Sequence, residues 1–397
     1  MRKHQNKIEK LIAELCPDGV EFKELGEIGE LYGGLSGKSK DDFSNGNAKF
    51  VTYMNIFSNI AVDTNIQHFV KVDGVEKQNR IQYGDVLFTG SSETPDECGM
   101  SSVLTKKVEE PLYLNSFCFG FRPNDSDLLL PEFSKYLFRD EQTRKQIGKT
   151  ASGVTRFNIS KKRFIKIKIP LPPLAVQKEI VKILDSFTEL EAELEAELEA
   201  RKKQYEYYQK KLILSNSGFE QVPLGNIATV GTGCHDTKDA VMDGQYVFYA
   251  RGRQALRLDS FDFDEEAVIT AGDGVGVGRV FHFADGKYAL HQRAYRIVPK
   301  ENVVPKFIYH YLIADFARYL ERTSVHASVT SLRRPMFLKY PISLPPLDEQ
   351  LRIVAILDKF DALVSDISVG LPAELSARRS QYEYYRGKLL TFKEYVG

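Results

Sequence analysis

The sequence lacks the features that mark several large protein classes. It has no apolar run near twenty residues and begins with the polar segment Met1–Glu9, so we expect a cytoplasmic protein with no membrane contact. Its four cysteines lie far apart without a Cys-x-x-Cys pair, a pattern that predicts neither a zinc site nor a disulfide framework. The 54 basic and 54 acidic residues cancel, which argues against a uniformly basic nucleic-acid binder.

Motifs of self-contained enzymes are missing as well. The chain has no Gly-x-x-x-x-Gly-Lys-Ser/Thr phosphate loop and no Asn-Pro-Pro-aromatic methyltransferase motif, and its seven histidines are scattered. The glycine-rich segment Gly272–Gly278 has the wrong spacing for a dinucleotide fingerprint and favours a tight turn between strands. The triplet Cys234-His235-Asp236 is isolated, which favours a structural or solvated turn over a metal fragment. We therefore expect no catalytic residue, no bound metal and no cofactor in this chain.

The sequence contains instead a long internal repeat. Leu171-Pro172-Pro173-Leu174 recurs as Leu344–Leu347 at an offset of 173, and the residues that follow match at the same offset. Gln204–Tyr208, which reads Gln-Tyr-Glu-Tyr-Tyr, recurs as Gln381–Tyr385 at an offset of 177. A repeat of this length decides how the whole chain is divided.

Each copy of the repeat begins a long helix. The two prolines cannot lie inside a helix but can precede one, and a single apolar stripe runs from Ile180 to Leu212. Close to forty helical residues span about 60 Å, too far to pack within one small domain. The second copy therefore supplies a partner helix. Gly370-Leu371-Pro372 interrupts that copy, and its segment Phe360–Tyr382 is four residues longer than Phe187–Tyr205, which predicts a kink or break.

Two strand-rich modules lie between the helices. The predicted parts are a short N-terminal helix at 1–20, a first module at 21–170, a first long helix at 171–215, a second module at 216–343 and a second long helix at 344–397. Strands are expected at 49–53, 84–89, 116–122, 164–169, 245–250, 267–270, 279–283 and 293–298. The fold class is a multi-domain α/β (α+β) protein with two similar mixed modules separated by two long antiparallel helices in a coiled coil. The repeat is circularly shifted relative to the chain ends.

In this order, these motifs resemble the DNA-specificity subunit of type I restriction–modification systems, over essentially the whole chain. The resemblance implies two target-recognition domains that read an asymmetric bipartite site on double-stranded DNA. It implies two modification subunits on the helices, which supply S-adenosylmethionine-dependent adenine methylation, and restriction subunits that use ATP and magnesium. It also implies that the four-residue repeats at 189–200 set the spacing between the half-sites. We expect the residues of the subunit interface to be Ile180, Leu184, Phe187, Tyr205, Tyr208, Ile353, Leu357, Phe360, Tyr382 and Tyr385.

Candidate DNA contacts follow from residue chemistry and from recurrence. Arginine suits guanine edges and phosphates, asparagine and glutamine suit adenine, and lysine suits phosphates. A polar loop followed by basic residues occurs at corresponding places in the two modules. In the first module the candidates are Lys38, Lys40, Ser91, Ser92, Asn115, Thr155, Arg156, Asn158, Lys161, Lys162 and Arg163. In the second module they are Arg251, Arg253, Arg257, Gln292, Arg293, Thr330, Ser331, Arg333 and Arg334.

Two other classes of function stay open from the sequence. One is a self-sufficient DNA enzyme, which the missing motifs disfavour. The other is a coiled-coil scaffold without direct DNA reading, which the zero net charge mildly favours.

Overall fold

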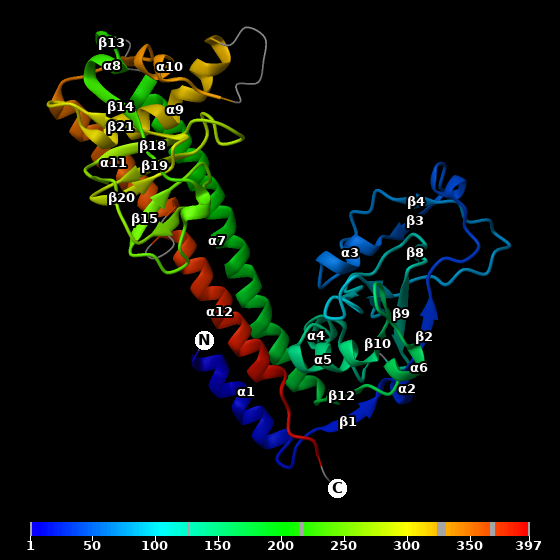
Figure 1. Ribbon diagram of the computed structural model, residues 1–397. Helices are drawn as coiled ribbons and strands as arrows, with labels where there is room; N and C mark the ends of the chain where they lie inside the picture. Colours follow the sequence, from blue (N-terminus) through cyan, green and yellow to red (C-terminus); the bar gives the residue numbers. More distant parts are fainter. Residues whose placement is uncertain (1, 126, 215–217, 324–330, 366–369, 396–397) are drawn as a thin grey trace. The chain divides into compact units, whose positions relative to one another are not determined.

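The computed structural model describes residues 2–125, 127–214, 218–323, 331–365 and 370–395. The chain divides into two compact units (Figure 1). The first comprises Met1–Ala192 and Ala377–Gly397, and the second comprises Glu193–Ser376. No helix among the described residues is long and apolar enough to cross a membrane.

The first unit is built on three small sheets and a two-stranded ribbon. One sheet has the order β2 (Gly29–Gly33), β9 (Cys118–Pro123), β5 (Val86–Thr89) and β7 (Ser101–Val103). Another has the order β4 (Phe69–Val70), β3 (Ala48–Val51) and β8 (Leu112–Leu114), with β3 and β8 parallel. The ribbon pairs β1 (Glu21–Glu24) with β12 (Lys168–Leu171). A further small sheet has the order β10 (Ala151–Ser152), β11 (Phe157–Ile159) and β6 (Ser91–Ser92).

The second unit repeats the four-stranded sheet and the ribbon of this plan, and its second sheet has one strand more than that of the first unit. Its first sheet has the order β14 (Ala228–Thr232), β21 (Ala294–Pro299), β18 (Ala267–Ala271) and β19 (Phe281–Ala284). Its second sheet has the order β16 (Leu256–Leu258), β15 (Tyr246–Tyr249), β20 (Lys287–Leu290) and β17 (Phe263–Asp264), with β15 and β20 parallel. The ribbon pairs β13 (Gln221–Pro223) with β22 (Pro341–Ser343). The predicted similarity of the two modules is therefore confirmed at the level of topology.

The helices of each unit pack against its sheets or against one another. In the first unit they are α1 (Arg2–Leu15), α2 (Leu25–Ile28), α3 (Tyr53–Ser58), α4 (Pro131–Leu137), α5 (Glu141–Thr150), α6 (Lys161–Phe164) and the start of α7 (Leu174–Leu214). In the second they are α8 (Leu224–Ile227), α9 (Pro305–Thr323), α10 (Arg334–Leu338) and α11 (Leu347–Ser365). The last helix, α12 (Leu371–Leu390), begins in the second unit and ends in the first.

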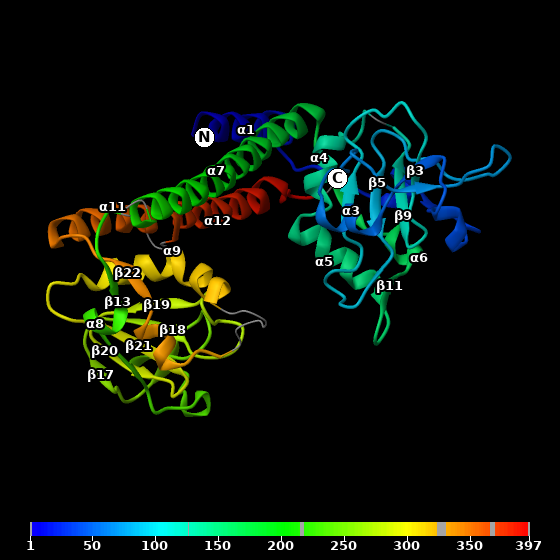
Figure 2. The same ribbon diagram turned by 90° about the horizontal axis from the view of Figure 1, so that it is seen from above.

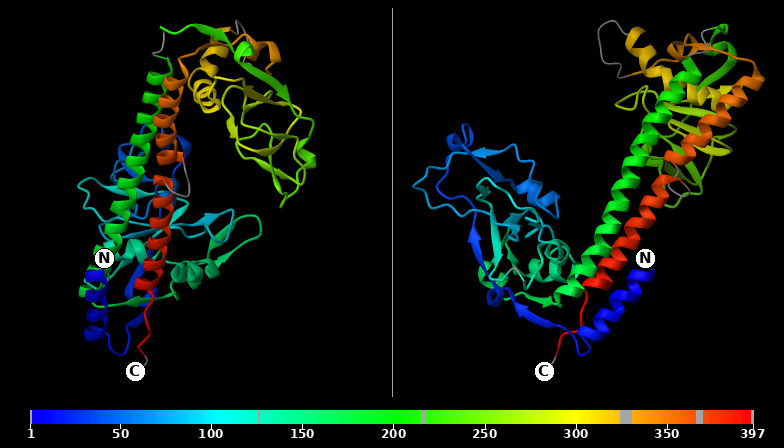
Figure 3. Two further views of the ribbon diagram at one scale, coloured as in Figure 1. Left: turned by 90° about the vertical axis from the view of Figure 1, so that its left-hand side faces the viewer. Right: turned by 180° about the vertical axis from the view of Figure 1, so that it is seen from behind.

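The coiled coil is antiparallel. In the first unit α7 runs beside α12 (Figure 2), where Phe187 stacks on Tyr385 with ring centroids 5.5 Å apart and Arg379 binds Glu191. In the second unit α7 lies beside α11 (Figure 3), and Phe360 stacks on Tyr208 at 5.7 Å. The last tyrosine of each copy of the Gln-Tyr-Glu-Tyr-Tyr motif therefore stacks on a phenylalanine of the neighbouring long helix in both units.

The predicted break in the second long helix is present. Helix α11 ends at Ser365 and α12 begins at Leu371, with Pro372 in its first turn. A side chain at Gly370 would meet the carbonyl oxygen of Ala362 at 2.4 Å, so only glycine fits at this turn.

The observed strands differ in their bounds from the predicted ones, and for three of them the local reason is visible. Residues 164–169 were expected to form one strand, but α6 extends to Phe164 and β12 begins only at Lys168. The strand predicted at 49–53 ends at Val51, because the Thr52 side chain accepts the backbone N–H of Asn55 and so caps α3. The strand predicted at 279–283 begins at Phe281, after the glycine-rich turn.

A buried glutamine joins each module to its long helix. Gln177 is fully buried, accepts the N–H of Leu130 and donates to the carbonyls of Leu128 and Pro172. Its repeat partner Gln350 accepts the N–H of Val304 and donates to the carbonyls of Asn302 and Pro345. The matching glutamines thus satisfy matching backbone groups that would otherwise be buried without partners.

A second pair of equivalent contacts differs chemically. Asp185 accepts hydrogen bonds from Tyr136 and Lys135 in the first unit. In the second unit the equivalent Asp358 contacts His310 at 3.0 Å and Lys306 at 2.6 Å. Burial lowers the pKa of His310, although the hydrogen bond and charge of Asp358 oppose this.

We expect the second unit to lose stability as the pH falls through about 6.5, the ordinary pKa of histidine. Below that pH the unfolded chain binds a proton that folded His310 still excludes. The free energy of unfolding therefore falls, by up to about 1.4 kcal/mol per pH unit. His310→Tyr, which introduces the residue of the first unit, should flatten this dependence in denaturant titrations between pH 7.5 and 5. Equal slopes in the two proteins would contradict the assignment.

Candidate nucleic-acid interface

Three backbone hydrogen bonds bring four distant loops of the first module together. The N–H of Gly90 donates to Phe117 O at 2.8 Å, and Gly90 O accepts from the N–H of Ile159 at 3.0 Å. The N–H of Asn115 donates to Val51 O at 3.0 Å. The residues next to these bonded positions therefore lie close together in space. We call the region where the four loops meet the loop corner.

The second module has the same three bonds at equivalent positions. Gly272 donates to Arg293 O at 2.8 Å and accepts from Leu332 at 2.7 Å, and His291 donates to Tyr249 O at 3.0 Å. A residue of the first module is equivalent to the residue of the second module that lies the same number of positions from the equivalent bonded residue. The pairs are Tyr53 with Arg251, Ser91 with Asp273, Phe117 with Arg293 and Asn158 with Ser331.

The loop corner of the first module is aromatic and polar. The Arg156 Nε donates to Ser91 Oγ at 3.2 Å, and its guanidinium lies 5.9 Å from the centre of the Phe117 ring. The hydroxyl of Tyr53 donates to Ser91 O at 2.9 Å. Phe117 is 62% exposed and Met54 is 60% exposed. A cavity of about 530 Å³ is lined by Tyr53, Met54, Phe57, Ser91, Ser92, Glu93, Glu97, Phe117, Thr155 and Arg156.

The loop corner of the second module is charged. Asp273 accepts from Arg251 at 2.8 Å through one oxygen and from Arg293 at 3.1 Å through the other. Burial opposes ionisation of Asp273, but the two arginines outweigh it and lower the pKa of Asp273. The arginine side chains remain 41% and 63% exposed. Asp273 thus holds two accessible guanidinium groups beside one another.

These two corners suit different base edges. A pair of arginines presents planar donor forks that match guanine edges and phosphates. An exposed phenylalanine and methionine beside hydroxyl groups match the thymine methyl group and hydrogen-bonding base edges. One backbone framework therefore displays two different surfaces.

The loop corners contain about half of the residues proposed from the sequence. In the first module they include Ser91, Ser92, Thr155, Arg156 and Asn158. In the second they include Arg251, Gln292, Arg293 and Ser331. Asn115 lies beside the corner, where its Oδ1 accepts the N–H of Phe117 and supports the turn.

Four corner residues were missed from the sequence: Tyr53, Met54, Phe117 and Asp273. Phe117 lies two residues after Asn115, a predicted contact, and a large apolar residue in such a turn could have been noticed. Asp273 lies in the glycine-rich segment, which does connect β18 to β19 as a turn. Its carboxylate could not have been matched to two arginines without the fold.

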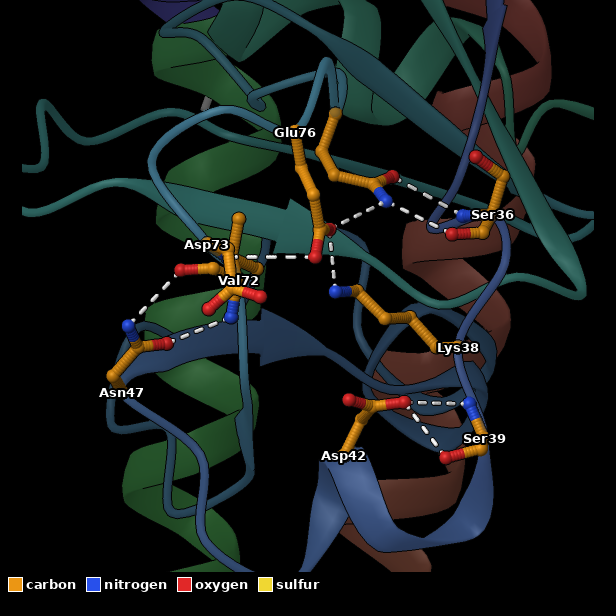
Figure 4. A network of polar contacts seen from close by, with 9 residues as sticks. Ser36, Lys38, Ser39, Asp42, Asn47, Val72, Asp73 and Glu76 are labelled. Carbon is orange, nitrogen blue, oxygen red and sulfur yellow. Dashed lines mark hydrogen bonds and ion pairs between the residues drawn. The ribbon is translucent and has the colours of Figure 1, made fainter.

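Two basic residues of the predicted DNA set make their described contacts within the fold, and their DNA roles stay predictions. The Lys38 side chain is only 5% exposed, and its ammonium binds Glu76 at 2.5 Å within the network of Figure 4. Arg163 donates to the carbonyls of Lys149, Thr150 and Ala151 at the end of α5. Free carbonyls at a helix end need such donors, which explains this arginine.

The other proposed basic residues lie outside the described corner contacts. Lys40, Lys161, Lys162, Arg253, Arg257, Arg333 and Arg334 are exposed. Arg333 and Arg334 directly follow Leu332, which anchors the second loop corner. Thr330 lies outside the described residues.

The predicted interface residues divide into two groups. Ile180, Leu184, Ile353 and Leu357 are fully buried in the cores of their own units, so their assignment to a subunit interface is corrected. A helical stripe predicts burial but does not reveal what covers it. The aromatic group packs across the coil within the chain and consists of Phe187, Tyr205, Tyr208, Phe360, Tyr382 and Tyr385.

The sequence matches a known family in both halves. A family profile described as "Type I restriction modification DNA specificity domain" matches residues 17–200 and 216–377. A putative type I restriction enzyme specificity subunit of Haemophilus influenzae is 34% identical over 270 residues, which cover 61% of this chain and 68% of that protein. The EcoR124I/EcoR124II specificity subunit of Escherichia coli is 36% identical over 257 residues, or 57% of this chain and 63% of that protein.

Solved structures show the same fold at low identity. The specificity subunit of a type I system from M. genitalium has a TM-score of 0.55 at 14% identity, covering 94% of this chain and 96% of that one. A structure describing assembly of a type I system has a TM-score of 0.63 at 17% identity, covering 94% and 98%.

Proposed function

The chain belongs to the type I restriction–modification DNA specificity family, and on this basis we propose how its two modules divide the work. Each module reads one half of an asymmetric bipartite site on double-stranded DNA through its loop corner. Specificity subunits are non-catalytic, so the chemistry belongs to other subunits. The observation that carries the proposal is the pair of loop corners, in which equivalent backbone bonds hold different side chains.

The helices are the docking platform in this proposal. Two modification subunits bind the coil and bring S-adenosylmethionine, and restriction subunits bring ATP and magnesium. Equivalent exposed tyrosines support this: Tyr207 is 60% exposed and Tyr384, at the matching position of the repeat, is 66% exposed. An apolar groove of about 740 Å³ beside Phe187 offers further surface. The complex works in the cytoplasm, where the DNA is.

A genome-wide map of N6-methyladenine tests the proposal. Cells that express the chain with its modification subunit should methylate a motif of two short defined halves around a fixed gap. Deleting the gene for this chain should abolish that methylation. Methylation that is independent of the chain would favour a coiled-coil scaffold without DNA reading.

We expect Arg293→Ala to weaken DNA binding through the second half-site only. A bidentate arginine contact with a base contributes about 1–3 kcal/mol, so affinity should fall by about tenfold or more. The measurement is a titration of the assembled methyltransferase against duplexes altered in either half. A loss that is the same for every sequence would instead assign Arg293 to a phosphate.

A matched control for that variant is Arg322→Ala. Arg322 is an exposed arginine of the same unit, on α9, with a 61% exposed side chain. The described contacts of Arg322, with Asp315 and the carbonyl of Arg318, are to α9 itself, so this variant removes the same charge without touching a described corner contact and affinity should stay close to wild type. Equal losses in the two variants would point to a general charge effect.

A further inference from the structure

Three residues of the second module have side-chain atoms that can bind a metal ion and that lie close together. Cys234 Sγ, a ring nitrogen of His235 and a carboxylate oxygen of Asp262 all lie within 4.8 Å of one another. The Asp262 Oδ1 is 3.0 Å from His235 Nε2 and 3.6 Å from Cys234 Sγ. Asp262 comes from a loop 27 residues beyond His235, which is why the sequence triplet alone looked incomplete.

These distances are close to those around one tetrahedral zinc ion. Zinc lies about 2.3 Å from sulfur and about 2.0–2.2 Å from nitrogen and oxygen. At tetrahedral angles, that geometry places sulfur and oxygen about 3.6 Å apart and nitrogen and oxygen about 3.4 Å apart. The observed separations require shifts of only a few tenths of an ångström for the two pairs that share Asp262.

One residue of β20 fixes two of the three ligands. The N–H of Leu290 donates to Asp262 Oδ2 at 2.9 Å, which leaves Oδ1 facing the cysteine and the histidine. The carbonyl oxygen of Leu290 accepts the N–H of His235 at 3.3 Å. The ligands are therefore held by the backbone and need no large rearrangement to bind.

A carboxylate also lies behind the histidine. Asp239 Oδ2 is 3.9 Å from His235 Nδ1, on the side of the ring away from Asp262. Metal-binding histidines commonly direct the other ring N–H toward such a carboxylate, which fixes the ring tautomer.

The module fold does not itself require these polar residues. In the first module the corresponding segment carries Leu35, whose N–H donates to Leu114 O as that of His235 does to Leu290 O. Leu35 is 5% exposed and packs with Phe50, Val70 and Tyr113. The scaffold thus forms with an apolar residue here, and the polar set is particular to the second module.

We propose that Cys234, His235 and Asp262 bind a zinc ion, with a water molecule in the fourth position. The thiol of Cys234 releases its proton to solvent, and His235 binds through Nε2 as a neutral ring. Sulfur, nitrogen and one carboxylate form a donor set that suits zinc better than magnesium or calcium. The ion fixes the loop that carries His235 and Asp236. Gln292 contacts this loop, because its N–H donates to His235 O and its Nε2 donates to Asp236 Oδ2.

Cobalt(II) titration of the full chain, freed of metal with a chelator, tests the site. We expect one cobalt ion per chain with a thiolate charge-transfer absorption, and zinc should displace it because zinc binds such sites more tightly. Cys234→Ser and Asp262→Asn should remove that absorption. Asp239→Asn should weaken binding by about 10- to 100-fold.

The controls separate the site from other ligands in the chain. Asp259→Asn alters a nearby carboxylate that accepts only the N–H of Gln245 among its described contacts, and it should bind cobalt like wild type. Circular dichroism shows whether each variant is folded, and Cys234 is exposed, so its replacement disturbs no core. An unchanged thiolate absorption in folded Cys234→Ser, or equally tight binding by folded Asp262→Asn, would overturn the proposal.

Discussion

Deleting Glu193–Ala196 should shorten the gap in the recognised DNA motif by about two base pairs and leave both half-sites unchanged. Methylation at the original spacing should be lost, because a module displaced by that distance no longer reaches its bases. The measurement is the N6-methyladenine map of cells that express the deleted chain with its modification subunit.

The size of the change follows from helix geometry. Four helical residues contribute about 6 Å of rise, and one base-pair step contributes about 3.4 Å. The removed segment is one of three Glu-Leu-Glu-Ala repeats within the continuous helix α7, and three of its four residues are exposed. Four residues also turn the helix by about 400°, so the stripe that faces the partner helix is displaced by only about 40°.

The control keeps the length and changes the charge. Glu193→Gln with Glu195→Gln removes two carboxylates from the same repeat, and the motif should stay as in wild type. New bases in either half-site after the deletion would show that the repeat affects reading, and an unchanged gap would show that another element sets the spacing.

Much of the fold could be predicted because the repeat carries local signals. Pro172 and Pro173 mark a helix start, the apolar stripe marks a buried face, and Gly370-Leu371-Pro372 marks a break. In the sequence, the buried glutamines are visible only as matching residues of the repeat. Their meaning, three hydrogen bonds to a module backbone, became visible only with the fold.

The interface was harder to predict because sequence shows charge but not the partner of each charge. Lys38 and Arg163 looked like DNA contacts, yet one binds a carboxylate and the other closes a helix end. Asp273 carries the opposite charge from DNA, yet it aligns two arginines. Loop corners join residues such as Ser91 and Asn158 that are far apart in the chain. No periodic pattern records such pairings.

The two modules also show what the repeat leaves free to vary. The anchoring hydrogen bonds of the loop corners recur within a few tenths of an ångström, while the side chains next to them change from Tyr53 and Phe117 to Arg251 and Arg293. The contact of the long helix likewise keeps its aspartate and exchanges Tyr136 for His310. Backbone geometry is therefore shared, and the chemistry displayed on it is particular to each module.

Gln177→Leu should destabilise the first unit by about 3 kcal/mol. Leucine has a similar volume, so the change leaves little cavity, but it removes all three hydrogen bonds of the buried amide. Each buried backbone group left without a partner costs about 1–3 kcal/mol, and partial access of water reduces the sum. This is a large fraction of the stability of a typical domain.

Hydrogen exchange measured by mass spectrometry locates the effect. Amides of α4 and the start of α7 should lose protection in Gln177→Leu, while those of α9 and α11 keep it. Gln350→Leu should show the reverse pattern, because its hydrogen bonds join α11 to the loop before α9. Gln146→Leu is the matched control, since the one described hydrogen bond of the Gln146 side chain is an exposed bond to Lys168 O, and its loss should change little. If Gln177→Leu exchanged no faster than this control, the buried amides would not be what joins each module to its long helix.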